Sequence, residues 1–568
     1  MHYVTNTPDQ HISEQAKTQP AAPPQLSPHY YVENFCLLID AVFTRYEDLL
    51  NEDEIRLHHD FHTLSLDAKS LYVRLLTRSG QCIRKSKLNY SEISNLNNAI
   101  EELQRSHLIE LNKPQDATVL LNLLTKAELQ NDLQQTTQKA PLHYRKPELI
   151  EHIVSQVDRD TIHERLWQLD TFVYPEKQAA FETYLLCFFG NTHQNLSEFV
   201  ISDLGHVRYE AYNLCNKTRF YNHRNAIDLH KLYSQVRESL ELPENKTNSR
   251  YLFNTALNLP SPEQLGGLTR RYEKIMVSTA RQLERLEALP AAMELYGRAS
   301  VHPSRERQAR ILKKLNQPQK AFTLCQNILA TSQHPEELEF ALRFGKPLAK
   351  QLKQPFQNDK PTDITTETIT LEKQDMSVEW AVAEHLSNHN QQCFYVENSL
   401  FCGLFGLYFW DAIFNPIEGA FLNPFQRGPL DLHSEYFYLD RKPTLDRLLE
   451  DIGTDQWQQR ILHTYEHKQG IANYFVHWGI INQPLLELSL SQIPSAHIKG
   501  VFEIMLKHPG LYRNGFPDLI VFGPNHYQLI EVKAPGDVIQ PNQKRWFRHF
   551  KQLGIPAILM KVAYTNNL

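Results

Sequence analysis

The sequence predicts a multidomain, mostly α-helical protein that ends in a compact α/β domain. Its 568 residues correspond to three or four domains of ordinary size. Apolar residues recur at helical spacing through most of the chain, whereas residues 515–533 have the pattern of two short strands joined by a turn. With 41% hydrophobic and 22% charged residues, the composition excludes a fibrous or wholly disordered chain.

Charge, cysteines and hydropathy limit the possible environments of the protein. The net charge of −6 means that any basic surface must be local. Seven scattered cysteines, with no Cys-x-x-Cys pair, argue for a reducing compartment and against a disulfide framework or a cysteine-based zinc finger. We find no secretory signal, and the most apolar run, 399–414, is too short to span a bilayer and contains Asp411. We therefore expect a cytoplasmic protein with no membrane partner.

The first 160 residues are expected to form a tail and two small helical modules. Residues 1–28 are polar and rich in Pro and Gln, which indicates a disordered tail. Residues 29–112 resemble a winged-helix domain, with short amphipathic helices closing on a strand; a small helical domain that binds no nucleic acid fits the pattern equally well. Residues 113–160 resemble a SAP module, which binds duplex backbone, with Thr125 capping a helix and Glu128 at the capping-box position.

Helix follows helix from 161 to 352, in pairs that resemble a tetratricopeptide array without a clean repeat length. The stretch 298–320 carries seven Lys or Arg against one Glu. Part of it is expected to form a helix at 304–316, whose basic face could neutralise DNA phosphates; a solvated charged surface is the alternative. Residues 353–376 are polar and rich in Pro and Thr, so they mark a linker or an extended edge. The candidates for the phosphate contact are Arg305, Arg307, Arg310 and Lys314.

The residues that carry chemistry lie in an expected β-hairpin with strands at 519–522 and 527–532. Asp518 lies at the start of the first strand, and Glu531 and Lys533 leave the same face of the second because they are two residues apart. Carboxylates are the hard oxygen ligands that Mg²⁺ or Mn²⁺ prefers, and a lysine can orient or deprotonate an attacking water. The pattern therefore predicts divalent-metal-dependent cleavage of a phosphodiester.

The order Pro-Asp, spacer, Glu-x-Lys resembles the restriction-endonuclease-like nuclease core. A turn, a helix from 541 and a last strand at 556–562 follow the hairpin, as in such a core. Residues 501–568 carry eight Lys or Arg against four Asp or Glu, which fits a polyanionic substrate. We therefore expect a nuclease domain over 377–568.

The run 531–546, which begins at the end of the second strand, is similar to the virus-type replication-repair nuclease (VRR-NUC) module. In that module Glu-Val-Lys-x-Pro is followed by an acidic residue and then by a Gln on the next helix. The resemblance implies that the backbone carbonyl of Val532 is a metal ligand and that Asp537 and Gln543 support the site. Val538 departs from the basic residue expected there in animal relatives.

A wider resemblance is to the family of Fanconi-associated nuclease 1. Residues 394–411 resemble the buried helix that opens its nuclease domain, and the Glu at the start of that helix contributes to the metal site. The resemblance implies this role for Glu397; a first-turn carboxylate favoured by the helix dipole is the alternative. The segments 30–35, 69–76, 185–191 and 198–205 extend the resemblance through the rest of the chain.

The family implies a structure-specific DNA endonuclease that cuts near 5′ flaps, degrades DNA in the 5′→3′ direction and acts in interstrand crosslink repair with Mg²⁺ or Mn²⁺. The two N-terminal modules would hold duplex DNA, and the array would supply a basic pocket for a 5′ phosphate. Since no Cys/His ubiquitin-binding zinc finger precedes residue 29, we expect the compact bacterial form, associated with the nucleoid, as a monomer or a DNA-induced dimer. Catalysis would depend on Glu397, Asp518, Glu531 and Lys533.

Two other functions remain open at this point. A Holliday-junction or general exonuclease could be built on the same core. A non-catalytic scaffold that binds DNA or protein is disfavoured by the intact Asp/Glu/Lys set. The sequence contains no Gly-x-Ser-x-Gly and no Gly-x-x-x-x-Gly-Lys-Ser/Thr string, so serine hydrolysis and ATP-driven unwinding are not expected.

Overall fold

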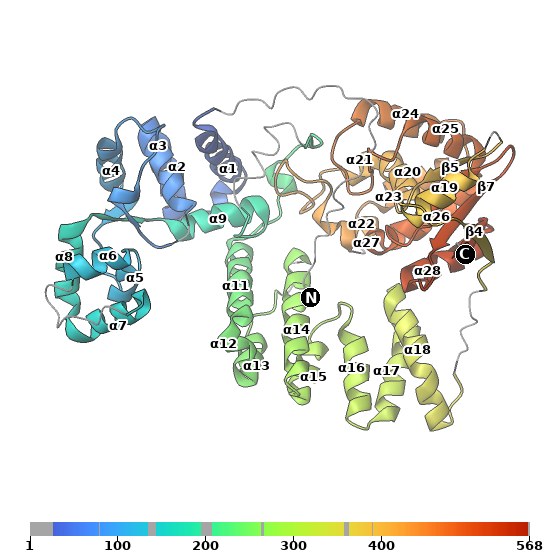
Figure 1. Ribbon diagram of the computed structural model, residues 1–568, viewed down its shortest axis with the longest axis horizontal. Helices are drawn as coiled ribbons and strands as arrows, with labels where there is room; N and C mark the ends of the chain where they lie inside the picture. Colours follow the sequence, from blue (N-terminus) through green and yellow to red (C-terminus); the bar gives the residue numbers. More distant parts are fainter. Residues whose placement is uncertain are drawn as a thin grey trace.

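The computed structural model describes residues 27–565 except 79, 134–143, 195–206, 263–265, 357–362, 389 and 435. The expected tail up to residue 26 and the family-like segment 198–205 therefore lie outside the described residues. N-terminal helices and a C-terminal sheet domain lie at opposite ends of the molecule, and a helical array runs below and between them (Figure 1). None of the described helices combines the length and the apolar character that a membrane span requires.

The N-terminal part consists of short helices around a small antiparallel sheet. The sheet has the order β1 (Ile83–Arg84), β3 (Phe172–Pro175), β2 (Ile109–Leu111). Thr125 and Glu128 form the predicted reciprocal capping box, which is thereby confirmed. The helices are α1 (Tyr30–Tyr46), α2 (Glu52–Thr63), α3 (Leu66–Leu76), α4 (Leu96–Arg105), α5 (Ala117–Leu121), α6 (Lys126–Glu128), α7 (Lys146–Gln156) and α8 (Arg159–Leu169).

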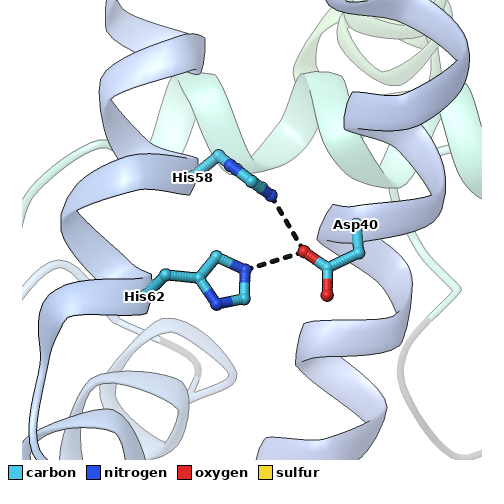
Figure 2. Close-up of side chains that lie close together, drawn as sticks. All are labelled: Asp40, His58 and His62. Atoms are coloured by element: carbon cyan, nitrogen blue, oxygen red, sulfur yellow. Dashed lines mark hydrogen bonds and ion pairs between the residues drawn. The ribbon is translucent and has the colours of Figure 1, made fainter.

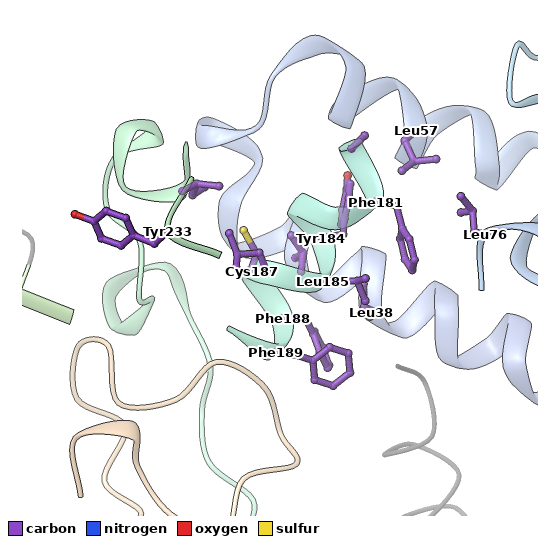
Figure 3. Packing of buried hydrophobic residues seen from close by; sticks show 14 of the residues in the cluster. Leu38, Leu57, Leu76, Phe181, Tyr184, Leu185, Cys187, Phe188, Phe189 and Tyr233 are labelled. Atoms are coloured by element: carbon purple, nitrogen blue, oxygen red, sulfur yellow. The ribbon is translucent and has the colours of Figure 1, made fainter. Parts of the chain in front are cut away.

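Helix α9 (Gln178–Phe189) connects the N-terminal helices to the array. It is apolar around most of its circumference, which suits a helix surrounded by others. Its Phe181 and Tyr184 are buried in the same core as Leu38 of α1 and Leu57 of α2 (Figure 3). This core continues into the array, so the N-terminal helices and the first array helices fold as one body.

The array is a series of antiparallel helix pairs in which consecutive helices pack on each other. The helix expected at 304–316 is confirmed as α16. The array helices are α11 (Arg224–Glu241), α12 (Pro243–Lys246), α13 (Ser249–Leu257), α14 (Gly266–Arg285), α15 (Leu289–Gly297), α16 (Ser304–Lys314), α17 (Pro318–Thr331) and α18 (Pro335–Leu352).

The C-terminal domain contains a five-stranded mixed sheet. Its β6 and β7 form the predicted antiparallel hairpin, whereas β7, β8 and β4 run parallel. Strand β4 lies within the segment 353–376, so part of this segment is an extended edge of the sheet and not a linker. Its alternating Thr-Glu-Thr-Ile-Thr-Leu suits an edge strand with one neighbour. The order is β4 (Thr366–Leu371), β8 (Ala557–Tyr564), β7 (Tyr527–Lys533), β6 (Leu519–Phe522), β5 (Gln392–Tyr395).

Helices cover both faces of this sheet. Leu519 and Ile530 pack with α19 on one face, whereas Ile520 and Leu529 pack with α20, α26 and α28 on the other. The run 399–414 is buried except for Asp411, and it forms two helices where the family resemblance implied one buried helix. The helices of the domain are α19 (Val378–Leu386), α20 (Leu400–Tyr408), α21 (Trp410–Ile413), α22 (Tyr436–Leu439), α23 (Lys442–Asp451), α24 (Trp457–Lys468), α25 (Gln483–Gln492), α26 (Ser495–Lys507), α27 (Pro509–Tyr512) and α28 (Pro541–Leu553).

Candidate active site

The charged residues of the hairpin meet at one end of β6 and β7. Asp518 immediately precedes β6, and its Oδ2 accepts a hydrogen bond of 2.8 Å from the N–H of Val532. The ammonium group of Lys533 donates to Oε1 of Glu531 at 2.7 Å. Because side chains alternate along a strand, Asp518, Glu531 and Lys533 all lie on the face that α20 and α28 cover.

The two carboxyls of the hairpin are buried, and this burial opposes their ionisation. Glu531 is fully buried, and its pKa is raised to about 8, first by burial and then by the charge of Asp518, against the opposing effect of Lys533. Burial also raises the pKa of Asp518 to about 6, with a smaller contribution from Glu397. Oε2 of Glu531 is buried and has no hydrogen-bond partner among the described residues. A cation at this position would satisfy that oxygen and favour the ionised form of both carboxyls.

Glu397 lies at the same end of the sheet, in the turn after β5. The N–H of Val396 donates to the carbonyl of Asp518 at 2.8 Å, so Glu397 and Asp518 leave adjacent antiparallel strands together. The charge of Glu397 acts on the pKa of both hairpin carboxyls. The expectation that Glu397 opens a helix is wrong, because α20 begins only at Leu400. Asn398, which follows Glu397 directly, has a φ of 52°, and this conformation places the chain in a turn before the helix.

Two residues that hold Glu397 in place were not found from the sequence. Oδ1 of Asn398 accepts hydrogen bonds from the N–H groups of Gly515 (2.7 Å) and Phe516 (3.0 Å), which ties the turn to the segment that leads to Asp518. The hydroxyl of Tyr395 donates to Oε2 of Glu397. The sequence Tyr-Val-Glu-Asn could have indicated a turn at this point, since Asn tolerates a left-handed backbone better than most residues.

The two supporting residues implied by the family differ in their contacts. The side-chain amide of Gln543, in the first turn of α28, donates to Oε1 of Glu531. Its own oxygen accepts from the N–H of Gln540 at 2.8 Å and so caps the helix. Asp537 is exposed and accepts from the N–H of Ala534 at 3.1 Å, which shapes the turn between β7 and α28.

The four array cations that we expected to contact a phosphate each pair with a carboxylate. One partner lies a turn earlier in α16, and the others lie in α14, in α18 and in the connection between α14 and α15, so that only the packing of the array brings them close. Such pairing removes most of the net positive charge from this face, so the structure does not bring the four together as a free basic cluster. The pairs are Arg305–Glu337, Arg307–Glu284, Arg310–Glu306 and Lys314–Glu287.

A second group of cations, on α14, was missed by the sequence reasoning. Burial lowers the pKa of Arg270, Arg271 and Lys274, and the two arginines lower that of Lys274 further. Within the described part of the chain, none of the three forms an ion pair with a carboxylate. The group extends into the nuclease domain, because Arg513, Arg270 and Lys274 all lower the pKa of His433, whose own burial acts most strongly. The sequence does contain a pattern from which this group could have been found: in the run Thr-Arg-Arg-Tyr-Glu-Lys, Arg270 and Lys274 are four residues apart and so lie one helical turn from each other.

Comparisons with known proteins agree with this geometry. The family model for the FAN1 HTH domain matches residues 29–110, and the VRR-NUC domain model matches residues 452–564. The Fanconi-associated nuclease 1 homolog of Pseudomonas aeruginosa is 31% identical over 565 residues, which cover 98% of this chain and 99% of that protein. The chain belongs to the Fanconi-associated nuclease family.

Other Fanconi-associated nucleases extend the comparison. The homolog of Arabidopsis thaliana is 24% identical over 606 residues, which cover 94% of this chain and 67% of that protein. The crystal structure of paFAN1 bound to DNA with a 2-nucleotide 5′ flap and a gap matches with a TM-score of 0.81 at 29% identity, covering 97% of this chain and 100% of that one. The predicted fold class, mostly helical with a C-terminal nuclease domain, is thereby confirmed. The chain is a nuclease of a family that typically depends on divalent metal ions.

Proposed function

We propose that this Fanconi-associated nuclease binds duplex DNA with a 5′ flap, hydrolyses a phosphodiester near the junction, continues as a 5′→3′ exonuclease and acts in interstrand crosslink repair. The observation that carries the proposal is the convergence of Asp518, Glu531 and Lys533 at one end of the hairpin. The complexes of paFAN1 with 5′-flap DNA support the same class of substrate for this chain.

We propose Mg²⁺ or Mn²⁺ as the cofactor, held by Glu397, Asp518, Glu531 and the carbonyl of Val532. Carboxylate and carbonyl oxygens are the ligands that these hard cations prefer. When bound, the ion would polarise the scissile phosphodiester and lower the pKa of a coordinated water. Oε2 of Glu531 is buried with no hydrogen-bond partner in the described part of the chain, and the pKa of both hairpin carboxyls is raised; both observations support this assignment.

Lys533 is the candidate for holding the attacking water. Its side chain is 13% exposed and donates one N–H to Glu531, which leaves two of its three N–H groups for a water and a phosphate oxygen. Gln543 donates to the same oxygen of Glu531, so the two donors together fix the orientation of that carboxylate. Asp537 shapes the turn that carries the chain from Lys533 to the helix of Gln543.

The 5′ phosphate of the DNA is proposed to bind the α14 cations Arg270, Arg271 and Lys274. Cations that have no carboxylate partner among the described residues gain more from a phosphate than the α16 cations, which already have such partners. The N-terminal modules would hold duplex DNA beside this cluster. We further propose that the protein acts at the bacterial nucleoid, as a monomer or as a dimer that forms on DNA.

The proposed catalytic role is tested by cleavage of an end-labelled 5′-flap duplex with Mg²⁺ or Mn²⁺. Lys533→Met should cut about 100- to 10,000-fold more slowly than the parent, the range typical for the loss of a proton-transfer group, and should still bind the flap. Lys561→Met is the matched control, because Lys561 lies opposite Lys533 on the neighbouring strand but is exposed. Asp518→Asn should behave like Lys533→Met. Parent-like cleavage by either variant would show that the site is misassigned.

The choice of substrate separates the proposed function from its alternatives. A 5′ flap, a four-way junction and a blunt duplex of the same sequences should be compared under identical conditions. Preference for the flap supports the proposal. Preference for the junction would favour Holliday-junction resolution, and equal rates would favour a general exonuclease. Absence of hydrolysis with every divalent metal would favour a non-catalytic scaffold.

The phosphate assignment needs its own experiment. Flaps that end in a 5′ phosphate or a 5′ hydroxyl should be cut at different rates by the parent protein. In the double variant Arg270→Gln, Lys274→Gln, the ratio of the cleavage rates for the 5′-phosphate and 5′-hydroxyl flaps should fall close to one. Arg310→Gln with Lys314→Gln should leave the ratio unchanged, whereas loss of the ratio in this pair alone would move the phosphate contact to α16.

A further inference from the structure

Three metal-ligating side chains lie together in the N-terminal helices, far along the chain from the proposed nuclease site. Asp40 lies on α1, and His58 and His62 lie on α2, which packs beside it (Figure 2). Nε2 of His58 is 2.8 Å and Nε2 of His62 is 2.7 Å from the same oxygen, Oδ1 of Asp40. Three donor atoms from two helices therefore converge on one point.

The spacing of the two histidines suits a shared ion. Residues four apart on a helix lie on one face, one turn from each other, so His58 and His62 present both rings in the same direction. The same spacing holds the metal in helices of the His-x-x-x-His type. Asp40 faces these rings from the neighbouring helix and supplies the third ligand.

The packing around the three side chains holds the ring of His58 in place and leaves His62 and Asp40 accessible to solvent. The His58 ring stacks on Phe43 of α1 with 4.0 Å between ring centroids and 6° between planes, and its side chain is only 14% exposed. The side chains of His62 and Asp40 are 36% and 48% exposed, so an ion can reach the three donors from solvent. A ligand held by packing beside two accessible ones is the arrangement that a preorganised site requires.

We propose that Asp40, His58 and His62 bind a divalent transition-metal ion, Zn²⁺ in the cell, with water completing its coordination. Two imidazoles and one carboxylate favour Zn²⁺, Co²⁺ or Ni²⁺ over Mg²⁺, which separates this site chemically from the proposed catalytic one. Metal–ligand distances of about 2.0–2.2 Å place tetrahedral donors about 3.3 Å apart, so each histidine nitrogen needs to move about 0.5 Å from its distance of 2.8 or 2.7 Å to Oδ1 of Asp40 to admit the ion.

Binding would link the first two helices of the segment that matches the HTH family model. These helices are joined by the short 3-10 turn Glu47–Leu49, and both contact the core helix α9. An ion that binds only the folded form stabilises it by mass action. The proposed site therefore has a structural role: the bound ion links α1 to α2 and stabilises the folded N-terminal module.

A second such group among the described residues fits an ion less well. Its members are His302, His334 and Glu336. Nε2 of His302 is 3.4 Å from Glu306, whereas its Nδ1 is 3.5 Å from Glu336, so the two nitrogens face different carboxylates. This second group could compete for the same metal ion, so the experiment must distinguish binding there from binding at Asp40, His58 and His62.

The test is a Co²⁺ titration of the full-length, chelator-treated protein, followed by the visible absorption of the bound ion. The parent for this test carries Asp518→Asn and Glu531→Gln, so that the proposed catalytic site does not contribute. Asp40→Asn keeps a hydrogen-bond acceptor for both histidines but removes the charged ligand. His62→Ala removes an accessible ligand, and His59→Ala, an exposed neighbour on α2, is the matched control.

The parent and His59→Ala should bind one equivalent of Co²⁺ that is lost in both Asp40→Asn and His62→Ala. The affinity in those variants should fall by at least about 100-fold, since even the loss of a residue that only orients a ligand costs about 10- to 100-fold. Zn²⁺ should raise the melting temperature of the parent and His59→Ala only. Equal Co²⁺ binding by all four proteins would assign the ion to other residues and overturn the proposal, as would a parent that binds no Co²⁺.

Discussion

Glu531 accepts hydrogen bonds from Lys533 and Gln543 through one carboxylate oxygen, whereas its other oxygen is buried without a partner among the described residues. A glutamate in this position is costly to ionise until a cation neutralises it. The same residue therefore contributes to the pH dependence of stability in the metal-free protein and to the proposed metal binding.

The first prediction concerns pH. The folded chain keeps Glu531 protonated up to a pKa of about 8, whereas an unfolded glutamate releases its proton near 4.5. Between these values the folded state binds more protons, so the free energy of unfolding of the metal-free protein falls as pH rises. We expect the urea midpoint of chelator-treated protein to fall from about pH 5 to about pH 8, and to fall less in Glu531→Gln. Identical pH profiles for the two proteins would contradict the raised pKa.

The second prediction concerns Gln543, whose amide orients Glu531. Gln543→Leu keeps the bulk of the side chain but removes the donor. We expect the Mg²⁺ concentration for half-maximal cleavage to rise by about 10- to 100-fold, as is usual when a residue that orients a metal ligand is lost. Gln552→Leu, on the exposed far end of α28, should leave it unchanged. A variant with lower maximal rate but normal Mg²⁺ dependence would assign Gln543 a different role.

At the residue scale, local patterns identified the site only in part. Asp518, Glu531 and Lys533 could be found because their chemistry and their strand spacing are both readable in a short segment. Asn398 could not, because its partners lie more than a hundred residues further along the chain. For the same reason the glutamate partners of Arg305 and Arg307 could not be found from the sequence, since they become adjacent only when the array packs.

At the scale of elements, the end of α9 gives a testable case. Gly190 ends this helix with a φ of 70°, and an added Cβ would lie 2.7 Å from a methyl group of Leu422. Gly190→Ala should therefore lower the free energy of unfolding by about 1–3 kcal/mol through backbone strain and overpacking. Gly297→Ala is the control, because no atom lies within 4 Å of its added Cβ and its φ is not positive. Urea denaturation measures both; equal midpoints would contradict the prediction.

The elements of the nuclease domain differ in how far the sequence predicts them. The hairpin of β6 and β7 and the helix α28 are contiguous, so spacing and turn residues suffice to find them. The edge strands β4 and β5 pair with β8 and β6, which are distant in sequence, and their pairing has no local signal. The start of α20 was placed too early because a positive φ at a single residue, Asn398, was not anticipated.

At the scale of the whole molecule, α18 of the array contacts α28 of the nuclease domain (Figure 1). Arg545 is buried at this contact and donates from Nε to Glu339 at 2.9 Å. The pair joins two distant parts of the chain, because its members are 206 residues apart. The array thereby holds the helix that carries Gln543, and through it the proposed site.

Breaking this pair should separate the array from the nuclease domain. Arg545→Met keeps the apolar packing but leaves Glu339 without its main partner, which should cost about 1–3 kcal/mol, since Glu339 is partly exposed. We expect the first thermal transition, followed by calorimetry, to shift to lower temperature. Lys551→Met, on the exposed side of the same helix, should change stability by less than about 0.5 kcal/mol. Equal transitions in the two variants would show that the contact contributes little.

The fold class was predictable for the molecule as a whole, because helical periodicity, the strand pattern and a long family resemblance are properties of the sequence. The way in which the N-terminal helices, the array and the nuclease domain pack on one another was not predictable from the sequence. The continuous core that joins α9 to both the N-terminal helices and the array depends on contacts between segments that carry no pairing signal of their own.

The position of β8 has a consequence for substitutions within this strand. β8 lies between β4 and β7, so both of its backbone edges are used in pairing. A proline placed inside β8 would remove an N–H group that one of these neighbours needs, and it would be tolerated far less well than on an edge strand. The nuclease sheet therefore depends on an uninterrupted β8.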